Sequence, residues 1–293
     1  MAGTLCHGGK PDGKTVQVLL SGGGYGRAYY DFPYRPESYS YVRAAVHAGA
    51  VTFNLDRIGI GESSRPFGVR VDVDANAYVV HQVIQVLRAG TITGTPLGPI
   101  VTVGHSMGSV MAIAHALDYP EDVEGIVLTG ILHTTNREYT ERVRDSSTLA
   151  IFDRRFGRRN LDFTYFTSKP GMREEMFYHG PAADPEVIAV DEATRETLTL
   201  GEIISVGRFD RNRTRDIGVP VLMVIGDRDF TSCGDEIDCA DHEAVAAYER
   251  QFFGTAADVA VAVIEDTGHV LNLHPSAPLT YATILDWIAR NIG

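Results

Sequence analysis

A serine flanked by glycines constrains this chain more than any other feature. The segment Gly104-His105-Ser106-Met107-Gly108 follows an apolar run at residues 99–103 and precedes a helical pattern. A G-x-S-x-G segment between a strand and a helix is typical of a nucleophile elbow, a sharp turn that exposes the serine hydroxyl. The glycines have a steric reason, because side chains there would collide with the neighbouring strand and helix. A chance match is the alternative, but the pattern favours Ser106 as a catalytic nucleophile.

Apolar runs and helical patterns alternate along most of the chain. This alternation predicts an α/β fold whose mostly parallel sheet is covered by helices on both faces. The predicted strands are residues 15–20, 50–55, 99–103, 123–128, 219–225 and 259–264, and the predicted helices are 39–48, 75–89, 106–117, 241–253 and 278–291. Active sites of such sheets lie at the carboxyl ends of the strands, where Ser106 is expected.

An elbow serine needs a base and an acid that orients the base. In this kind of fold the acid and then the histidine follow the serine along the chain. The predicted strand at 219–225 is followed by Asp227 and Asp229, and that at 259–264 is followed by Gly268-His269. We expect His269 to be the base and Asp229 to be the acid, with Asp227 as the competing acid.

Other histidines fit other roles better. His242 lies in a polar helical segment and is expected to be solvated, whereas His274 precedes a proline and is expected to cap or pack a helix. His105 lies inside the elbow and should point away from the serine.

Taken together, these motifs resemble the α/β-hydrolase superfamily over nearly the whole chain. The resemblance rests on the elbow, on the Gly-rich turn at residues 20–26, on Asp56-Arg-Ile-Gly-Ile-Gly-Glu-Ser63, and on the Asp229 and Gly268-His269 segments. Within the superfamily the chain looks like a bacterial, actinomycete-type lipase/esterase-like group. The resemblance implies an α/β-hydrolase fold with a helical cap insertion.

The resemblance also implies an oxyanion hole, which is a pair of backbone N–H groups that bind the developing negative charge. Those donors map to Gly23 and Met107, with Gly24 as the alternative to Gly23. Many members carry His-Gly where this chain has Ser21-Gly22. A phosphate-cradling loop is disfavoured because no G-K-[ST] follows the glycines.

The interval from His133 to Asp216 breaks the strand–helix alternation and is too long for an ordinary connection. It lies where the superfamily inserts its cap, which predicts a core of residues 1–132 and 217–293 and a cap of residues 133–216. The interval is rich in aromatic residues, although some of these must form the cap's own core. The candidates to line a substrate pocket are His133, Phe163, Tyr165, Phe166, Phe177 and Tyr178.

Two of the three cysteines, Cys233 and Cys239, bracket a polar loop just after the candidate acid. This spacing favours a small disulfide loop over free thiols. A metal site is less favoured, since no further ligand lies nearby in the sequence.

The formal net charge of -12 disfavours nucleic-acid binding and binding to anionic membranes. No stretch approaches the ~20 apolar residues of a membrane span, and no signal peptide is visible. We expect a cytoplasmic protein as the sequence stands, or a secreted one if a signal sequence was removed before Met1. The sequence does not indicate an oligomeric state.

The expected activity is that of a serine hydrolase, without metal or organic cofactor, on an ester, lactone or thioester of a small to medium apolar molecule. One alternative is a tailoring enzyme of natural-product biosynthesis on the same scaffold, which would catalyse elimination, cyclisation or acyl transfer. A second alternative is a non-catalytic binding protein with a hydrolase fold.

Overall fold

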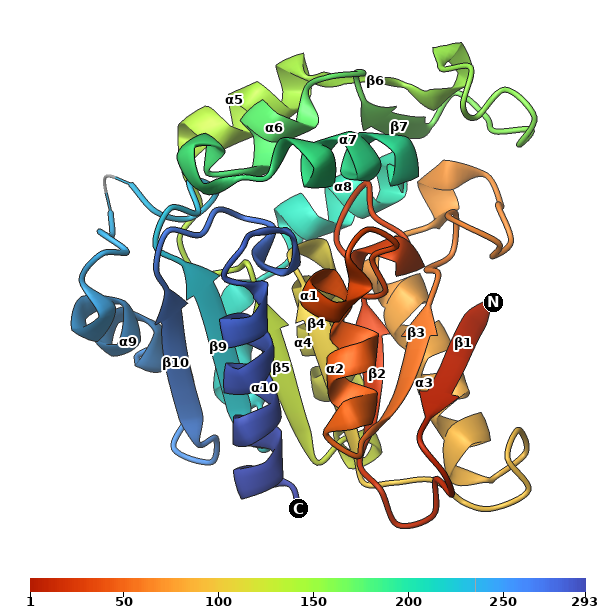
Figure 1. Cartoon of the computed structure of the whole chain (residues 1–293), viewed down its shortest axis with the longest axis vertical. Helices are drawn as coiled ribbons and strands as arrows, with labels where there is room; N and C mark the ends of the chain where they lie inside the picture. Colours follow the sequence, from red (N-terminus) through yellow and green to blue (C-terminus); the bar gives the residue numbers. More distant parts are fainter. Residues whose placement is uncertain (235) are drawn as a thin grey trace.

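The computed structural model describes residues 1–234 and 236–293. Its centre is a seven-stranded sheet in the order β1-β3-β2-β4-β5-β9-β10, in which only β1 runs antiparallel to its neighbour (Figure 1). The strands are β1 (Gly3–His7), β2 (Val16–Leu20), β3 (Val51–Leu55), β4 (Ile100–His105), β5 (Gly125–Thr129), β9 (Val221–Gly226) and β10 (Val259–Ile264). All six predicted strands are present, and β1 is an additional edge strand.

Helices cover both faces of this sheet, as predicted. One face carries α1 (Pro36–Tyr39), α2 (Tyr41–His47) and α10 (Ala277–Asn291), and the other carries α3 (Val73–Arg88), α4 (Met107–Asp118) and α9 (His242–Arg250). Two hydrophobic clusters result, because successive strand residues point to opposite faces: Val18 and Leu20 belong to one cluster and Leu19 to the other. Within the described residues, no helix is long and apolar enough to cross a membrane.

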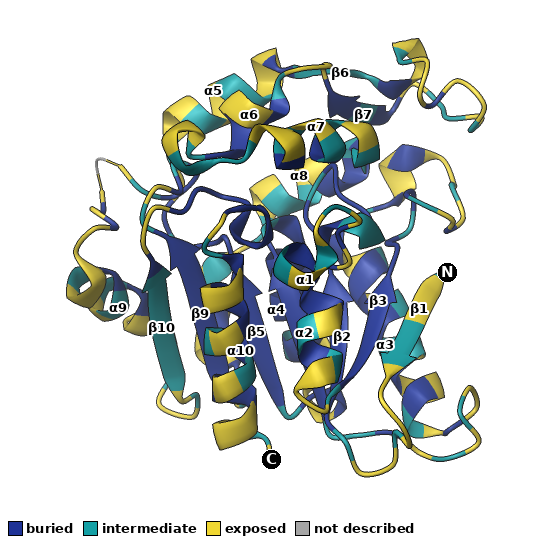
Figure 2. Ribbon diagram, in the orientation of Figure 1, coloured by how far each residue is buried: buried dark blue, intermediate teal, exposed yellow. Residues whose placement is uncertain are grey.

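Burial follows the order of the strands. Every residue of β2, β3, β4, β5 and β9 is buried, whereas β10 at one edge is mostly half-buried and β1 at the other edge is mostly exposed (Figure 2). Parallel strands covered on both faces require continuous apolar runs, which is why the sequence revealed them. The loops after β4, β9 and β10 all lie at the carboxyl edge of the sheet.

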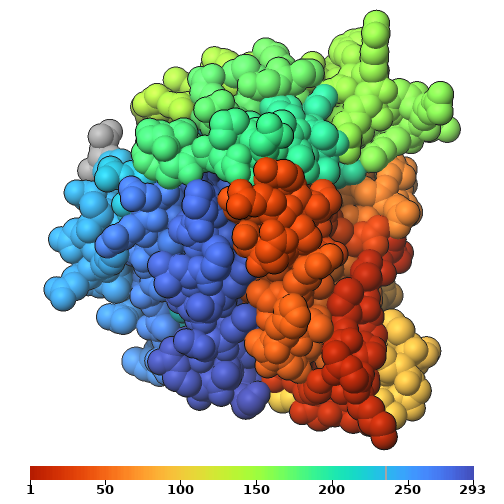
Figure 3. All heavy atoms as spheres, in the orientation of Figure 1, coloured from red at the N-terminus to blue at the C-terminus, as the bar shows by residue number. Residues whose placement is uncertain are grey.

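Residues 133–216, which we call the cap segment, lie above this carboxyl edge and pack along it on the face seen in Figure 3. The segment was expected to be helical, but it also contains a three-stranded antiparallel sheet in the order β6-β7-β8. Its elements are α5 (Arg137–Asp145), β6 (Ser147–Leu149), β7 (Tyr165–Ser168), α6 (Arg173–Phe177), α7 (Pro185–Thr194), β8 (Leu198–Thr199) and α8 (Leu200–Arg208). Strands of two to four residues are too short to show a two-residue period, so the sequence did not reveal them.

Candidate active site

Ser106 forms the turn between β4 and α4. Its backbone φ of 53° and ψ of -117° are rare for a residue with a side chain. The Ser106 N–H donates to the Thr129 carbonyl oxygen at 2.8 Å, which holds the turn against β5. A Cβ at Gly104 would lie 2.5 Å from the Gly108 carbonyl oxygen, and one at Gly108 would clash with the carbonyl of Leu20. Both glycines of the motif are therefore required by close backbone packing around the serine.

His269 and Asp229 form a buried pair beside this turn. Asp229 follows β9 and His269 follows β10, and the Nδ1 atom of His269 lies 3.0 Å from Oδ2 and 3.2 Å from Oδ1 of Asp229. Both side chains are almost fully buried. Because the carboxylate accepts the proton on Nδ1, the other ring nitrogen, Nε2, is left to accept a proton. His269 and Ser106 line the same cavity.

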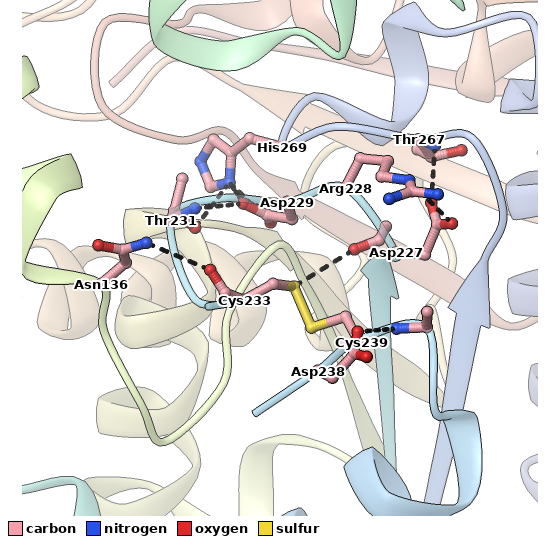
Figure 4. The surroundings of a disulfide bond; sticks show 12 residues. Asn136, Asp227, Arg228, Asp229, Thr231, Cys233, Asp238, Cys239, Thr267 and His269 are labelled. Atoms are coloured by element: carbon pink, nitrogen blue, oxygen red, sulfur yellow. Dashed lines mark hydrogen bonds and ion pairs between the residues drawn. A yellow bond between two sulfur atoms is a disulfide. The ribbon is translucent and has the colours of Figure 1, made fainter. Parts of the chain in front are cut away.

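The competing acid, Asp227, has a different partner. Its Oδ1 accepts a hydrogen bond from the Thr267 N–H at 3.2 Å, and its Oδ2 lies 3.4 Å from Nε of Arg228 (Figure 4). Asp227 thus ties the loop after β9 to the loop after β10. The carboxylate that contacts His269 is that of Asp229.

A disulfide joins Cys233 and Cys239, so that the loop carrying Asp229 is closed a few residues further on (Figure 4). The N–H of Cys233 donates to the backbone carbonyl of Asp229 at 2.9 Å, and the Thr231 N–H donates to Asp229 Oδ1 at 3.0 Å. The first cysteine of the disulfide is therefore hydrogen-bonded into the turn that presents the Asp229 carboxylate. The third cysteine, Cys6, is free.

The remaining histidines near the site have structural contacts. His274 is buried, donates from Nδ1 to the Val270 carbonyl at 3.0 Å, and accepts at Nε2 from the N–H groups of Gly268 and His179. Burial lowers the pKa of His274 to about 4, so it is a neutral support for the loop that carries His269. His242 is exposed at the start of α9.

His105 is fully buried and stacks on the ring of Tyr29, with ring centres 4.3 Å apart. Burial, together with the nearby His269, holds its pKa well below the ordinary value. His105 therefore packs beneath the elbow as a neutral ring.

The Gly-rich turn after β2 lies directly against the elbow. A Cβ at Gly22 would lie 3.2 Å from the Cβ of Ser106, and one at Gly23 would lie 3.6 Å from the Cε of Met107. Gly23, Gly24 and Met107 all line the cavity. Among the described residues, none of their three N–H groups donates a hydrogen bond within the protein. These N–H groups are therefore available to a substrate oxygen near Ser106.

The cavity has a volume of about 760 Å³ and lies between the core and the cap segment. Apolar side chains provide the larger part of its wall, and polar or charged side chains such as Asp210, Arg211 and Glu236 provide the rest. A mainly apolar wall with some polar groups is typical of sites for small organic ligands. The apolar side chains from the described residues are Tyr25, Met107, Val110, Ile131, Tyr139, Val143, Met176, Phe177, Leu198, Ile203, Val206 and Phe209. Most of them come from the cap segment.

Only two of the six residues predicted to line the pocket do so. Phe177 lines the cavity and stacks on the ring of His269, with ring centres 5.8 Å apart. His133 also lines it, but its Nδ1 lies 2.6 Å from Glu249 Oε2 and its Nε2 lies 3.0 Å from Thr214 Oγ1. Both nitrogens of His133 are thus engaged within the protein, which leaves this side chain a structural role in the wall.

The other four predictions for the pocket are wrong. Phe163 is 64% exposed and packs against Phe67 on the outside of the protein. Tyr165 is buried but donates its hydroxyl to the Pro66 carbonyl at 2.6 Å, and Phe166 is half-buried in β7 away from the cavity. The Tyr178 hydroxyl donates to Asp191 at 3.0 Å, and Tyr178 does not line the cavity.

Several cavity residues missed by the sequence analysis are spaced along single helices. Tyr139 and Val143 are four residues apart on α5, and Ile203 and Val206 are three apart on α8. Such spacing places side chains on one face of a helix. This periodicity, rather than aromatic content, was the signal that could have found them.

Arg173 on α6 is a buried cation in the cavity wall. Its Nε donates to Asp191 Oδ2 at 2.9 Å and its Nη1 donates to the Gly24 carbonyl at 3.3 Å. The guanidinium also lies over the ring of Tyr25, 4.0 Å from its centre. The cap segment therefore contacts the Gly-rich turn through Arg173, which donates to the Gly24 carbonyl and lies over Tyr25 while Asp191, also in the cap segment, balances its charge.

Comparison with known proteins agrees with this architecture. A family model described as the alpha/beta hydrolase family matches residues 17–280. The chain therefore belongs to the alpha/beta hydrolase family. The chain has no match among curated proteins.

Solved structures with the same fold include hydrolases and a bromoperoxidase. A thermophilic esterase from Thermogutta terrifontis, with malate bound, shares 19% identity at a TM-score of 0.66, covering 100% of this chain and 94% of that one. A monoacylglycerol lipase from Paleococcus ferrophilus shares 17% identity at a TM-score of 0.64, covering 99% and 100%. A bromoperoxidase from Bacillus anthracis shares 19% identity at a TM-score of 0.64, covering 98% and 94%. At these identities the likeness shows the fold.

Proposed function

We propose that the protein is a serine hydrolase that cleaves a carboxylic ester, lactone or thioester of a small to medium apolar molecule through an acyl-enzyme. The observation that carries this proposal is the buried pair of His269 and Asp229 on the cavity that Ser106 also lines. A histidine that contacts a buried carboxylate through Nδ1 has its Nε2 available as a general base. The elbow conformation of Ser106 supplies the matching nucleophile.

In the proposed reaction the Ser106 oxygen attacks the substrate carbonyl carbon while its proton passes to Nε2 of His269. Asp229 stabilises the resulting imidazolium and keeps the ring in place. The carbonyl oxygen becomes an oxyanion that accepts hydrogen bonds from the N–H groups of Met107 and Gly23. His269 then gives its proton to the leaving alcohol or thiol, and an acyl-enzyme remains.

In the second half of the reaction, water attacks the acyl carbon and gives a proton to His269. Collapse of the tetrahedral intermediate returns that proton to Ser106 and releases the carboxylic acid. The oxyanion site acts again in this step. A single preorganised N–H donor typically contributes about 10²–10³ to the rate, so the two amides account for much of the expected acceleration.

The cavity wall supports an apolar substrate. Burial of apolar area stabilises a complex by about 25 cal/mol per Å², and the apolar part of the wall offers such area. Polar side chains such as Asp210, Arg211 and Glu236 offer hydrogen bonds to a polar part of the substrate. The leading candidates for substrate contact are Phe177, beside His269, and the apolar residues of α5 and α8. The buried Arg173, paired with Asp191, contacts the Gly-rich turn at the Gly24 carbonyl.

The test is covalent labelling followed by hydrolysis assays. The intact mass after reaction with a fluorophosphonate should rise by one adduct, and Ser106→Ala should not label although its thermal unfolding stays close to that of the wild type. A series of p-nitrophenyl esters of rising chain length should then give turnover with the wild type only. Undiminished labelling of Ser106→Ala would overturn the proposal.

A different outcome would favour the tailoring-enzyme alternative. If Ser106 labels with the fluorophosphonate but no ester, lactone or thioester is hydrolysed, the nucleophile is active and net hydrolysis is not the reaction. Elimination, cyclisation or transfer to a nucleophile other than water would then be the better proposal. Failure of Ser106 to label at all would favour the non-catalytic alternative.

A further inference from the structure

A buried arginine outside the proposed triad contacts the backbone of the Gly-rich turn. Arg57 follows β3 and its side chain is 1% exposed. Its Nε donates to the Ser21 carbonyl at 3.1 Å, and its Nη2 donates to the Gly22 carbonyl at 2.9 Å. Two consecutive carbonyls of the turn are therefore held by one guanidinium, whose planar fork fixes direction as well as distance.

The hydrogen bond to Gly22 has a consequence for Gly23. The Gly22 carbonyl and the Gly23 N–H belong to the same planar trans peptide, in which the two groups point in opposite directions. The Gly22 carbonyl accepts from Arg57 and also from the Tyr25 N–H at 3.2 Å, so the Gly23 N–H must point to the other side of the peptide. Gly22 packs against the elbow, since a Cβ at Gly22 would lie 3.2 Å from the Cβ of Ser106, and Gly23 lines the same cavity as Ser106.

The guanidinium is itself held by the cap segment. Its Nη1 forms a buried ion pair with Oε1 of Glu202 on α8, whose side chain is fully buried. The other oxygen of Glu202, Oε2, accepts the Thr199 N–H at 2.9 Å in the capping box that starts α8. A contiguous chain of hydrogen bonds thus runs from the first turn of a cap helix to the peptide beside Ser106.

We propose that Arg57 is a positioning residue that sets the Gly23 N–H as an oxyanion donor, and that Glu202 makes this donor depend on the docked cap segment. The inference rests on the proposed function, because an oxyanion donor matters only if Ser106 attacks a carbonyl. Under this proposal the oxyanion donor of the Gly-rich turn is Gly23 rather than Gly24. The guanidinium also polarises the peptide that it binds, which strengthens the N–H as a donor.

The test compares variants that weaken the contacts of Arg57 with a control variant that weakens a separate ion pair in the cap segment. Arg57→Lys keeps the charge but loses the fork, and Glu202→Gln keeps the shape but loses the charge. Removing one partner of a buried pair can unfold a protein, so the neutral double variant Arg57→Gln/Glu202→Gln is included. The control is Asp153→Asn, which weakens the Arg195–Asp153 ion pair of the cap segment.

The readout separates positioning from general stability. A trifluoromethyl ketone forms a hemiketal oxyanion with the serine, whereas the isosteric methyl ketone measures binding without it. We expect Arg57→Lys and the double variant to lower kcat by about 10- to 100-fold. This loss is smaller than the ~10²–10³-fold loss in kcat on removal of a whole oxyanion donor, because the Gly23 N–H is misplaced rather than removed. KM and methyl ketone inhibition should change less than about threefold, while trifluoromethyl ketone inhibition weakens in parallel with kcat/KM. Asp153→Asn should change none of these.

Two results would overturn the inference. One is a folded Arg57→Lys or double variant with unchanged kcat and trifluoromethyl ketone inhibition. The other is an equal loss of binding for both ketones, which would mean that the cavity as a whole is distorted. If neither Arg57 variant folds, inhibition of Glu202→Gln by the two ketones is compared in the same way, and the same outcomes apply. Failure of the proposed function is distinguishable, because the wild type itself would then neither label nor turn over.

Discussion

The Nδ1 atom of His269 lies 3.0 Å from Oδ2 of Asp229, and neither side chain is accessible to water beyond a few per cent. A hydrogen bond between an imidazole and a buried carboxylate fixes both the tautomer and the orientation of the ring. The second ring nitrogen is thereby directed to the cavity that Ser106 lines. This relationship distinguishes the two aspartates that the sequence left in competition.

We predict that Asp229→Asn lowers kcat by roughly 10³- to 10⁴-fold, because an amide at this position stabilises the wrong tautomer of His269 and no imidazolium. Asp227→Asn is the matched control, two residues away, and should change kcat less than about threefold, since Asp227 contacts Thr267 instead. Steady-state hydrolysis of a p-nitrophenyl ester checks both. A larger loss in Asp227→Asn would show that the acid is misassigned.

The arrangement of the core could be predicted from the sequence because each central strand is covered on both faces. Such strands must be apolar throughout, and their runs are visible without any structure. The strand β1 was missed, since Gly3–His7 is a short edge strand whose residues are mostly exposed and carry little apolar pattern. Ser106, His269 and Asp229 could be proposed together because each follows a recognisable strand in the required order, and the structure brings their side chains to one region.

The pocket-lining residues of the cap segment could not be predicted in the same way, because aromatic content does not indicate which way a side chain points. Phe177 is the last residue of α6, and Tyr178 is the C-cap with an extended backbone, so the two neighbouring side chains leave the chain in different directions. Phe177 faces the cavity, whereas Tyr178 turns to Asp191. Arg57 was missed for a related reason: its role depends on Gly22 and Glu202, which are distant in the sequence.

We predict that the disulfide stabilises the protein and the turn of Asp229. Cross-linking a loop this short removes conformational entropy from the unfolded chain worth about 2 kcal/mol. Cys233→Ser/Cys239→Ser should therefore lower the free energy of unfolding in urea by about that amount, whereas Cys6→Ser should leave it nearly unchanged. An equal effect of Cys6→Ser would contradict the prediction. Alkylation of the denatured, unreduced wild type should modify only Cys6.

We predict an acid-sensitive stability that depends on His274. Burial lowers its folded pKa to about 4, below the value of about 6.5 in an unfolded chain. Between these values the unfolded chain binds a proton that the folded protein does not, so stability falls as the pH falls from 6.5 to 4. The full effect is on the order of 3 kcal/mol and is complete below pH 4.

Urea unfolding at pH 7.5 and pH 4.5 measures this effect. His274→Gln should be less stable than the wild type at pH 7.5, because it loses packing and a ring acceptor for two N–H groups. It should lose about 2–3 kcal/mol less than the wild type on acidification, since it has no group to titrate. His242→Gln, at an exposed position, should follow the wild type. Parallel losses in all three proteins would mean that His274 does not set the acid sensitivity.

The last prediction concerns how the cap segment selects its substrate. Phe209 contributes to the cavity wall, whereas Phe163 is 64% exposed outside it. Phe209→Ala should raise KM for long-chain p-nitrophenyl esters by about tenfold for each 1.4 kcal/mol of lost contact, with little change for the acetyl ester, which does not reach that far. Phe163→Ala should affect neither ester, because its ring contacts Phe67 rather than the cavity. If Phe209→Ala raises KM for the acetyl ester as much as for the long-chain esters, the residue supports the fold of the cap segment and does not contact the substrate. If Phe163→Ala instead weakens only the long-chain esters, the acyl chain leaves the cavity over the outer surface of the cap segment.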